Sequence, residues 1–426
     1  MEKPQMKNTL EAITLRVLNV AFDVSSEKLD YSYMPDSRVI SDACDNDTNS
    51  IRAALVSLHK FAEKHGFQEV RVVCESTGIY HRSLLQIASQ LGMRTKLAGG
   101  EAVAAQRKIR FNDTGKSDPR DSEAILDVSR YGRLLKHRQL QDQYDQLREF
   151  HRLVLRYEKK HVAVRNELHA ELRLLFADLR VSTDVLYGPT GKALLAAFGA
   201  NPQRIVAAGR EGFDRQIKSL SRNTKRKTLD RIWDQAVSFM SQNTSSALLT
   251  IREEYATELH AAILEYKAKI ANVELRMIEI YQQLQSQDQQ LPAARKGVVT
   301  WRMLARLIAE TGPLDDFCSW RQIMRYAGLN LLERQSGKFK GQLRISRRGR
   351  AAIRKILNKI ALSLVIRGRL FSKYYRRKKD EDKMPGDKAM TCVMRKILKM
   401  IYGWSRSGQE FDETRVFEQP RKRIAA

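Results

Sequence analysis

The sequence predicts two kinds of structure in one chain, an α/β domain followed by a longer all-α region. Short β-rich runs alternate with helical runs from residue 14 to about residue 138, whereas the chain beyond is almost wholly helical in pattern. With 426 residues and 42% hydrophobic content, the chain can bury a sizeable core and is long enough for two or three domains. We expect three parts, residues 1–138, 139–290 and 291–426.

The first part opens with three strand-like runs, over residues 15–23, 28–34 and 38–41. A helix is predicted over residues 50–65, where apolar residues keep helical spacing and Gly66 supplies the stop. The next elements are a strand over 70–75, a helix over 83–91, a strand over 94–97 and helices over 102–109 and 121–131. This order, βββαβαβα, predicts a mixed sheet flanked by helices, and it is the order of ribonuclease H-like nucleases.

Residues 139–290 are rich in Gln, Glu, Lys, Arg and Leu, and they predict long antiparallel helices over 146–176 and 247–287. In the second helix, apolar residues recur at steps of three or four and form a coiled-coil-like seam. The seam consists of Leu259, Ile263, Tyr266, Ile270, Val273, Met277 and Ile280. Glycines and prolines interrupt the pattern between about 180 and 244, which indicates an inserted subdomain. A helical arm or spacer is the ordinary interpretation of this part.

The last part, residues 291–426, is expected to be mostly helical and strongly basic. From Arg334 through Lys379 the chain has seventeen Lys or Arg residues and no Asp or Glu. A run of one sign repels itself unless phosphates screen it, so contact with nucleic acid is favoured over a merely solvated face. Tyr374 and Tyr375 lie inside this run, where they could stack on bases or pack in the core.

The charge of the whole chain points to the same class of partner. Lysine and arginine number 76 against 49 acids, so the formal net charge is +27, which favours a polyanion. No apolar run approaches the roughly 18 to 20 residues that span a bilayer, and the N-terminus is not a signal peptide. We therefore expect no membrane contact and a cytoplasmic location. The four cysteines are widely scattered, which argues against a zinc knuckle or a disulfide framework.

Acidic residues end two of the predicted strands. Asp23 follows the apolar run 15–22, and Glu75 follows the run 70–74. Desolvating an ionised carboxylate costs several kcal/mol or more unless a partner offsets that cost. A bound cation is the simplest partner, so both acids are candidate metal ligands.

Asp118 and Asp121 stand three residues apart at the predicted start of a helix. Alone, they would be interpreted as an N-cap and a residue that interacts favourably with the helix dipole. Together with Asp23 and Glu75, they predict a set of four oxygen ligands that suits Mg²⁺ or Mn²⁺. Two such ions can stabilise the attacking and leaving oxygens at a phosphodiester. Lys116 could steer phosphate or balance the cluster, although a plain surface lysine fits equally well.

A serine-glycine pair, Ser336 and Gly337, lies within the basic run. Such a pair is most often just a turn. A serine hydroxyl is a poor nucleophile unless a base or metal lowers its proton affinity, and no histidine lies near Ser336 in the sequence. The predicted metal site could supply that activation.

With these motifs the chain resembles the bacterial insertion-sequence transposases that have a DEDD ribonuclease H-like (RuvC-like) domain, including the bridge-RNA-guided recombinases. The N-terminal matches are Phe22-Asp23, Glu75-Ser76-Thr77-Gly78-Ile79-Tyr80 and Lys116-Ser117-Asp118-Pro119-Arg120-Asp121. The C-terminal matches are Tyr326-Ala327-Gly328-Leu329, Gln335-Ser336-Gly337 and Ile345-Ser346-Arg347-Arg348-Gly349. The order of the motifs and the intervening helical arm match too, so the resemblance spans most of the chain.

The resemblance implies that Asp23, Glu75, Asp118 and Asp121 bind Mg²⁺ or Mn²⁺ and that Ser336 attacks DNA. It also implies cleavage and rejoining of donor and target DNA, with a structured bridge RNA as guide. The basic residues that we expect to contact nucleic acid are Lys116, Arg334, Lys338, Lys340, Arg344, Arg347, Arg348, Arg350 and Arg354. Ser336 lies 215 residues beyond Asp121, so the two centres can meet only by domain folding or across subunits, and we expect a homo-oligomer, a dimer or tetramer.

Three alternatives stay open. A ribonuclease H-like junction resolvase or nuclease would use the same four acids with water as the nucleophile, so Ser336→Ala would leave its metal-dependent cleavage intact. A non-catalytic nucleic-acid-binding protein would lose no function on Asp23→Ala beyond modest electrostatic effects. A structural coiled-coil scaffold would need neither the acids nor the basic part.

Overall fold

The computed structural model describes residues 16–75, 78–111, 118–176, 179, 183–240, 245–288, 290–332, 335–336, 339–341 and 343–417. For residues 111, 118, 119, 183, 184, 335, 336, 339 and 340 it describes the backbone and not the side chain. The chain divides into two compact units, residues 1–139 and 140–426, and each is described separately below.

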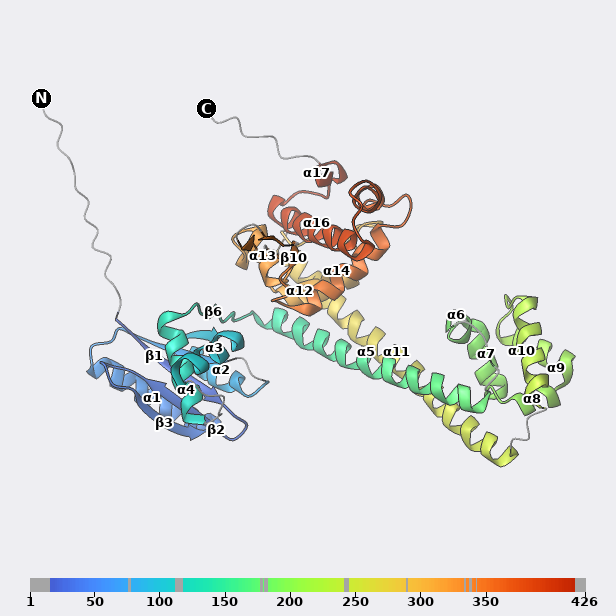
Figure 1. The fold of residues 1–426 in the computed structure, drawn as a ribbon, viewed down its shortest axis with the longest axis horizontal. Helices are drawn as coiled ribbons and strands as arrows, with labels where there is room; N and C mark the ends of the chain where they lie inside the picture. The colour runs from blue at the N-terminus through green and yellow to red at the C-terminus, as the bar shows by residue number, and fades with distance from the viewer. Residues whose placement is uncertain are drawn as a thin grey trace, which may run out of the picture. The chain divides into compact units, whose positions relative to one another are not determined.

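Unit 1 is a six-stranded mixed sheet flanked by helices (Figure 1). Its elements are β1 (Val17–Val24), β2 (Lys28–Tyr33), β3 (Ile40–Asp45), α1 (Thr48–Lys64), β4 (Glu69–Glu75), α2 (His81–Gln90), β5 (Arg94–Ala98), α3 (Gly100–Phe111), α4 (Asp118–Tyr131) and β6 (Leu135–Lys136). The strand order is β3-β2-β1-β4-β5-β6, with β1, β4 and β5 parallel and the outer strands antiparallel. The predicted α/β fold class and its element order are therefore confirmed.

The central strands β1 and β4 are apolar because both faces of the sheet are covered. On one face, Phe22 and Cys74 pack in a core with residues of α1 and α2. On the other face, Ala21 and Val73 pack against α3 and α4, in a core that includes Ile125. Side chains alternate between the two faces along a strand, so this pattern assigns every residue of β1 and β4 to one face.

Two strands differ from the sequence prediction. The third strand runs over Ile40–Asp45, beyond the predicted 38–41, because its polar residues bond to β2. Ser41 Oγ lies 2.9 Å from Ser32 Oγ, and Tyr31 donates a hydrogen bond of 3.1 Å to Asp42. The two-residue strand β6 was not predicted, since it is exposed and too short to show a period.

Unit 2 is built on two long helices, α5 (Asp142–Leu175) and α11 (Ser246–Gln287), which run antiparallel (Figure 1). Among the described residues, five shorter helices lie between them in the sequence, in the range where an inserted subdomain is predicted. These are α6 (Thr183–Leu186), α7 (Pro189–Phe198), α8 (Pro202–Ala207), α9 (Gly209–Leu220) and α10 (Arg226–Phe239). They share one hydrophobic core with the C-terminal half of α5 and the N-terminal half of α11.

The other ends of α5 and α11 pack in a second core with the C-terminal elements. The helices are α12 (Trp301–Thr311), α13 (Trp320–Tyr326), α14 (Ala351–Leu364), α15 (Ser372–Arg376), α16 (Gly386–Ser407) and α17 (Glu413–Phe417). Four two-residue strands accompany them, β7 (Leu331–Leu332), β8 (Gln335–Ser336), β9 (Phe339–Lys340) and β10 (Arg344–Ile345). Leu314–Asp316 forms a 3₁₀ turn and Arg377–Glu381 a π-helical turn. Within the described part of the chain, no helix is long and apolar enough to cross a membrane.

A buried ion network joins α5, α11 and α12. The Arg306 side chain is 5% exposed and donates to Glu274 at 2.8 Å through Nε and to Glu158 at 2.9 Å through Nη1. Lys359 of α14 adds a contact of 3.1 Å to Glu158, and Arg302 one of 3.2 Å to Glu274. The network thus links α12 and α14 to the two long helices α5 and α11.

Replacement of Glu274 by alanine is expected to destabilise unit 2 by about 3–5 kcal/mol, since it strips a buried guanidinium of its main partner. The control is Glu265→Ala on the same helix, where Glu265 pairs with Lys269 at a solvent-exposed site, and a loss of at most about 1 kcal/mol is expected. All four tryptophans belong to unit 2, so denaturant unfolding followed by tryptophan fluorescence reports this unit. Equal shifts in the two variants would contradict the network's importance.

Candidate active site

The first two predicted ligands lie side by side at the ends of paired parallel strands. In the parallel register of β1 and β4, Phe22 pairs with Cys74, and Asp23 and Glu75 each follow by one residue. Both are two residues beyond Ala21 and Val73, so they lie on the face of the sheet that α3 and α4 cover. The sheet therefore brings these two carboxylates to one edge and one face.

The helix α4 brings Asp121 to the same face. Ser122 of α4 is buried, and its Oγ lies 2.7 Å from Oγ of Ser32, a residue of β2 that pairs with Ala21. Asp121 is also buried, at 6% exposure. Asp118 is the first residue of α4, and its side chain is outside the described residues, as is the whole of Lys116. The four-carboxylate set therefore stays a prediction.

The sheet places a further carboxylate beside Asp23 that the sequence analysis missed. Asp30 of β2 pairs with Asp23 in the antiparallel register and is 9% exposed. Directly paired residues share a face, so Asp30 lies on the acid-bearing side. Lys28 approaches Asp30 at 2.7 Å and balances its charge. The alternation of Asp30 and Ser32 along β2 was visible in the sequence, but the pairing with Asp23 was not.

Glycine at the start of α3 makes room for Glu75. A Cβ on Gly100 would lie 2.7 Å from Oε1 of Glu75, which is closer than real Cβ contacts allow. The Glu75 carboxylate therefore occupies the space that a side chain at position 100 would fill. The N-terminal end of a helix also favours a negative charge. Both effects hold Glu75 near the backbone of residues 99 and 100.

An arginine on α3 faces Asp121. Arg107 Nε lies 2.6 Å from Asp121 Oδ1, in an orientation that does not meet hydrogen-bond geometry. The two side chains are 19% and 9% exposed. Asp121 Oδ1 thus accepts no hydrogen bond from the described residues, and the guanidinium supplies only charge. A buried carboxylate oxygen that lacks a hydrogen-bond donor is suited to a cation.

The predicted ligands are all carboxylates, whose oxygens Mg²⁺ and Mn²⁺ prefer. Among the side chains that the structure describes, no three of His, Cys, Asp or Glu stand close enough together to hold a metal ion. Asp23, Glu75 and Asp121 fit a divalent cation in chemical type and in the face that they share. Together with Asp118, they are the residues predicted to hold it.

The Arg107→Gln variant, which lacks the guanidinium charge, is expected to bind a divalent cation about tenfold more tightly or better. The reason is that the guanidinium competes for Asp121 and repels a cation. The matched control is Arg110→Gln, one helical turn further along α3. Arg110 pairs with Glu123 and Asp127, neither of which is a predicted ligand. Titration of Mn²⁺ by calorimetry measures both variants, and equal affinities in Arg107→Gln and Arg110→Gln would contradict a role of Arg107 beside the cation.

The predicted nucleophile lies in unit 2, in a small hairpin. Ser336 is the second residue of β8 and pairs with Phe339 of β9 in an antiparallel register. Its side chain is outside the described residues. Residues 337 and 338, which join the two strands, are outside the described residues. The catalytic role of Ser336 stays a prediction.

Two segments that contain glycine, residues 326–328 before the hairpin and residues 347–350 after it, pack backbone against backbone. A Cβ on Gly349 would lie 2.5 Å from both the Gly328 nitrogen and the Tyr326 oxygen, so no side chain fits there. Arg347 N donates to Gly328 O at 3.0 Å, and Arg350 N to Tyr326 O at 2.9 Å. The segments that flank the serine hairpin are thus held in one fixed arrangement.

Two of the predicted phosphate contacts, Arg350 and Arg354, have protein partners in this arrangement. Arg354 Nη1 donates to Ala327 O at 2.9 Å. Arg350 Nε lies 2.9 Å from Glu310 Oε2, and Arg350 Nη1 donates to the Tyr326 hydroxyl at 3.0 Å. Both guanidinium groups therefore stabilise the turn.

Glu310 connects this turn to the arm. His151 of α5 is fully buried, and its Nδ1 lies 2.8 Å from Glu310 Oε1. Burial would raise the pKa of Glu310, but the hydrogen bond with His151 and the charge of Arg350 outweigh it and hold the pKa below its usual range. Glu310 is thus an ionised link between α5 and the segment that precedes α14.

The remaining predicted nucleic-acid contacts divide into two groups. Arg344, Arg347 and Arg348 are exposed, on β10 and the turn after it. Arg334 and Lys338 are outside the described residues, and Lys340 is described only in its backbone. Tyr374 and Tyr375 are half-buried against the C-terminal core, which favours the packing interpretation of these two residues.

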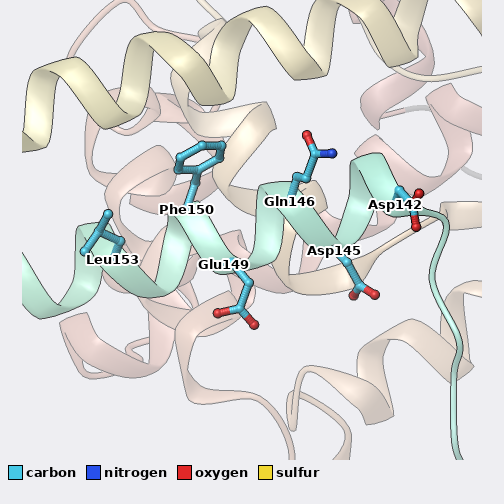
Figure 2. A pocket seen from close by; sticks show the side chains of 6 residues that line it. All are labelled: Asp142, Asp145, Gln146, Glu149, Phe150 and Leu153. Carbon is cyan, nitrogen blue, oxygen red and sulfur yellow. The ribbon is translucent and has the colours of Figure 1, made fainter. Parts of the chain in front are cut away.

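A hollow on the surface of unit 2 belongs to neither predicted site. It runs along the start of α5 and is lined by Asp142, Asp145, Gln146, Glu149, Phe150 and Leu153 (Figure 2). Figure 2 shows Asp145 and Glu149 extending to one side of the helix and Phe150 to the other. Three carboxylates from a single helix repel phosphate, and no nucleophile accompanies them, so this hollow is unsuited to DNA chemistry.

Comparison with protein families gives two matches, one that spans unit 1 and the start of unit 2 and one that lies within unit 2. A DEDD transposase model of the IS110 group, described as a transposase, matches residues 20–177. A second model, described as the transposase IS116/IS110/IS902 family, matches residues 299–376. No curated protein matches the chain. The two models cover more than half of the sequence, in the same order as the predicted acid and serine regions. The chain therefore belongs to the IS116/IS110/IS902 family of insertion-sequence transposases, enzymes that cleave and rejoin DNA.

Proposed function

We propose that this transposase acts through a composite site, in which the carboxylates of unit 1 bind a divalent cation and Ser336 of unit 2 is the nucleophile. The observation that carries the proposal is the meeting of Asp23 and Glu75 on one edge and one face of the sheet, with Asp121 of α4 buried on that face. The two family matches, over residues 20–177 and 299–376, support it.

In the proposed reaction, the Ser336 oxygen attacks a DNA phosphorus atom. A serine–phosphate ester forms, one phosphorus–oxygen bond of the DNA backbone breaks, and one DNA hydroxyl is released, which takes up a proton. A hydroxyl from the partner DNA strand then attacks the ester, which frees the serine and rejoins the DNA. Because the ester conserves the phosphodiester bond energy, no nucleotide cofactor is required. A bound Mg²⁺ or Mn²⁺ would stabilise charge on the attacking and leaving oxygens.

The proposal assigns different tasks to the protein residues around the two centres. Gly100 leaves the space that the Glu75 carboxylate occupies, and Arg107 balances the charge of Asp121 before a cation binds. Gly349, Arg350 and Arg354 fix the backbone of the segments that flank the serine hairpin. Fixed positions matter because a misplacement of about 1 Å at a reacting atom can cost about 100-fold in rate.

We further propose that the active enzyme is a homo-oligomer, in which the acids of one subunit serve Ser336 of another. Co-expression of the Asp23→Asn and Ser336→Ala variants tests this arrangement. If sites form across subunits, a mixed dimer contains one intact site, and strand exchange is expected at about a quarter of the wild-type level or more. If each site forms within one subunit, every site lacks one group and the mixture stays inactive, which contradicts the arrangement.

A structured guide RNA is part of the proposal, supported by the family resemblance and by the net charge of +27. Nucleic acid extracted from protein purified from the native host tests this part. A discrete RNA species that is required for strand exchange supports guidance. Full strand exchange by protein freed of RNA would contradict it.

The alternative function is a ribonuclease H-like nuclease or resolvase with water as the nucleophile. The serine hairpin and its fixed flanking turns would then have no chemical task. Cleavage by the Ser336→Ala variant at the wild-type rate would favour this alternative.

A further inference from the structure

The helix α16 (Gly386–Ser407) has a strongly basic solvent side, and it lies outside the basic run 334–379 discussed above. After Asp387 the helix contains no acid, whereas five lysines and arginines follow. Its apolar residues, among them Val393 and Ile397, are buried in the C-terminal core. Figure 1 shows α16 among the C-terminal helices of unit 2.

Two lysines of this helix lie over aromatic rings. Lys396 Nζ lies 5.4 Å from the ring centre of Tyr374 and 5.0 Å from that of Phe417. Lys399 Nζ lies 4.9 Å from the ring centre of Trp320. An ammonium group within about 6 Å of a ring centre is attracted by the negative face of the ring. The rings therefore help to fix the positions of both charges.

Arginines extend the same patch on both sides. Arg377 lies over the Tyr374 ring, which Lys396 also contacts, and its guanidinium carbon is 5.3 Å from the ring centre. Arg321 lies 4.8 Å from the ring centre of Trp320. We name Lys396, Lys399, Arg377 and Arg321, with the rings of Tyr374 and Trp320, the α16 patch.

The α16 patch differs from other lysine sites of unit 2 in having no carboxylate partner. Lys269 pairs with Glu265, Lys359 with Glu158 and Lys378 with Asp382. Among the residues that the structure describes, no carboxylate approaches Lys396 or Lys399 within 4.0 Å. An aromatic ring orients an ammonium group without cancelling its charge, whereas a carboxylate would cancel it. The positive potential of the patch therefore remains available to an external anion.

The concentration of charge in the patch is unfavourable in the free protein. Burial, together with the neighbouring charges of Lys399 and Arg377, lowers the pKa of Lys396. The positive charges of Lys396, Lys399 and Arg377 repel one another, and a bound anion would relieve that repulsion. Lys396 and Lys399 stand one helical turn apart, so they are spread along a line and do not converge on a single point. A repeating anion fits this arrangement better than a single small one.

We propose that the α16 patch binds the sugar-phosphate backbone of a nucleic-acid strand. The fixed charges of Lys396 and Lys399 provide the contacts, and the patch extends the nucleic-acid interface beyond the segment that contains Ser336. The binding is independent of the cleavage chemistry. Its failure can therefore be separated from a failure of the proposed mechanism.

The test is the salt dependence of binding by the full-length chain, with Lys396→Gln and Lys399→Gln combined. Fluorescence anisotropy is measured in the presence of EDTA, so that no cleavage occurs, with a labelled single-stranded RNA, a single-stranded DNA and a duplex DNA. Each lost phosphate contact lowers the slope of log affinity against log salt by about 0.7 on single strands and about 0.9 on duplex DNA. For the double variant, we expect the slope to decrease by about 1.4 if the patch binds a single strand, or by about 1.8 if it binds duplex DNA. The affinity should be at least about tenfold weaker near 0.1 M salt.

Two further variants make the result specific. The combination of Lys269→Gln and Arg204→Gln removes the same charge from ion-paired sites with Glu265 and Glu253, and the slope should stay as in wild type. Lys396→Arg with Lys399→Arg keeps the charge and should also retain the slope. The probe whose affinity falls most in the double glutamine variant identifies the bound nucleic acid as single-stranded RNA, single-stranded DNA or duplex DNA. An unchanged slope of the double glutamine variant on all three probes would overturn the proposal.

Discussion

The Ser336→Ala variant is expected to lose DNA strand cleavage by about 10⁴-fold or more and to form no covalent DNA adduct, because removal of a catalytic nucleophile costs this much in comparable enzymes. Binding of element-end DNA should be unchanged, since the hydroxyl group carries no charge. Cleavage of a labelled element-end duplex in Mg²⁺ measures the rate, and anisotropy with the same duplex in EDTA measures binding.

The control for this serine is Ser363→Ala on α14. The Ser363 hydroxyl donates to Ile360 O within its own helix, so its removal should leave cleavage near the wild-type rate. If Ser336→Ala cleaved as fast as Ser363→Ala, water would be the nucleophile and the nuclease alternative would hold.

Asp23→Asn is expected to reduce cleavage by about 10³-fold or more and to abolish stoichiometric Mn²⁺ binding. The substitution keeps the shape of the side chain and removes one anionic ligand. A divalent cation contributes several kcal/mol to charge stabilisation in the transition state, and each ~1.4 kcal/mol is a factor of ten in rate. Rates in Mg²⁺ and Mn²⁺, together with calorimetric Mn²⁺ titration, measure both effects.

Asp42→Asn is the matched control for this carboxylate. Asp42 belongs to the same sheet but pairs with Tyr31, whose ring packs on the opposite face beside α1 and α2. The loss of its charge should leave cleavage and Mn²⁺ affinity unchanged. Similar losses in both variants would indicate a general effect of charge or folding, and would remove the support for a cation at Asp23.

Much of unit 1 could be predicted because its signals are local. The apolar runs that become β1 and β4 end in Asp23 and Glu75, and parallel pairing brings these ends together. Asp30 could not be recognised in the same way. The pairing of Asp30 with Asp23 depends on the antiparallel register of β1 and β2, and no short window of sequence specifies that register. Arg107 is similar, since its contact with Asp121 depends on how α3 packs beside α4.

In unit 2, the count of charges predicted a basic region but not the task of each residue. Arg350 and Arg354 look like Arg344 and Arg347 in the sequence, yet they bond to Glu310 and to the Ala327 carbonyl group. Glu310 itself lies 26 residues before Ser336, and its partner His151 lies on the arm. Such pairings depend on tertiary packing, whereas the helical period of α5 and α11 is a local property and was predicted from the sequence.

The central claim is that Ser336 forms a covalent bond with DNA, and mapping that bond tests it most directly. The full-length protein is incubated with Mg²⁺ and element-end DNA, then digested with protease and nuclease and analysed by mass spectrometry. We predict a nucleotide attached through phosphate to the peptide that contains Ser336, dependent on the divalent cation. An adduct on any other residue, or complete cleavage with no adduct at all, would contradict the serine mechanism.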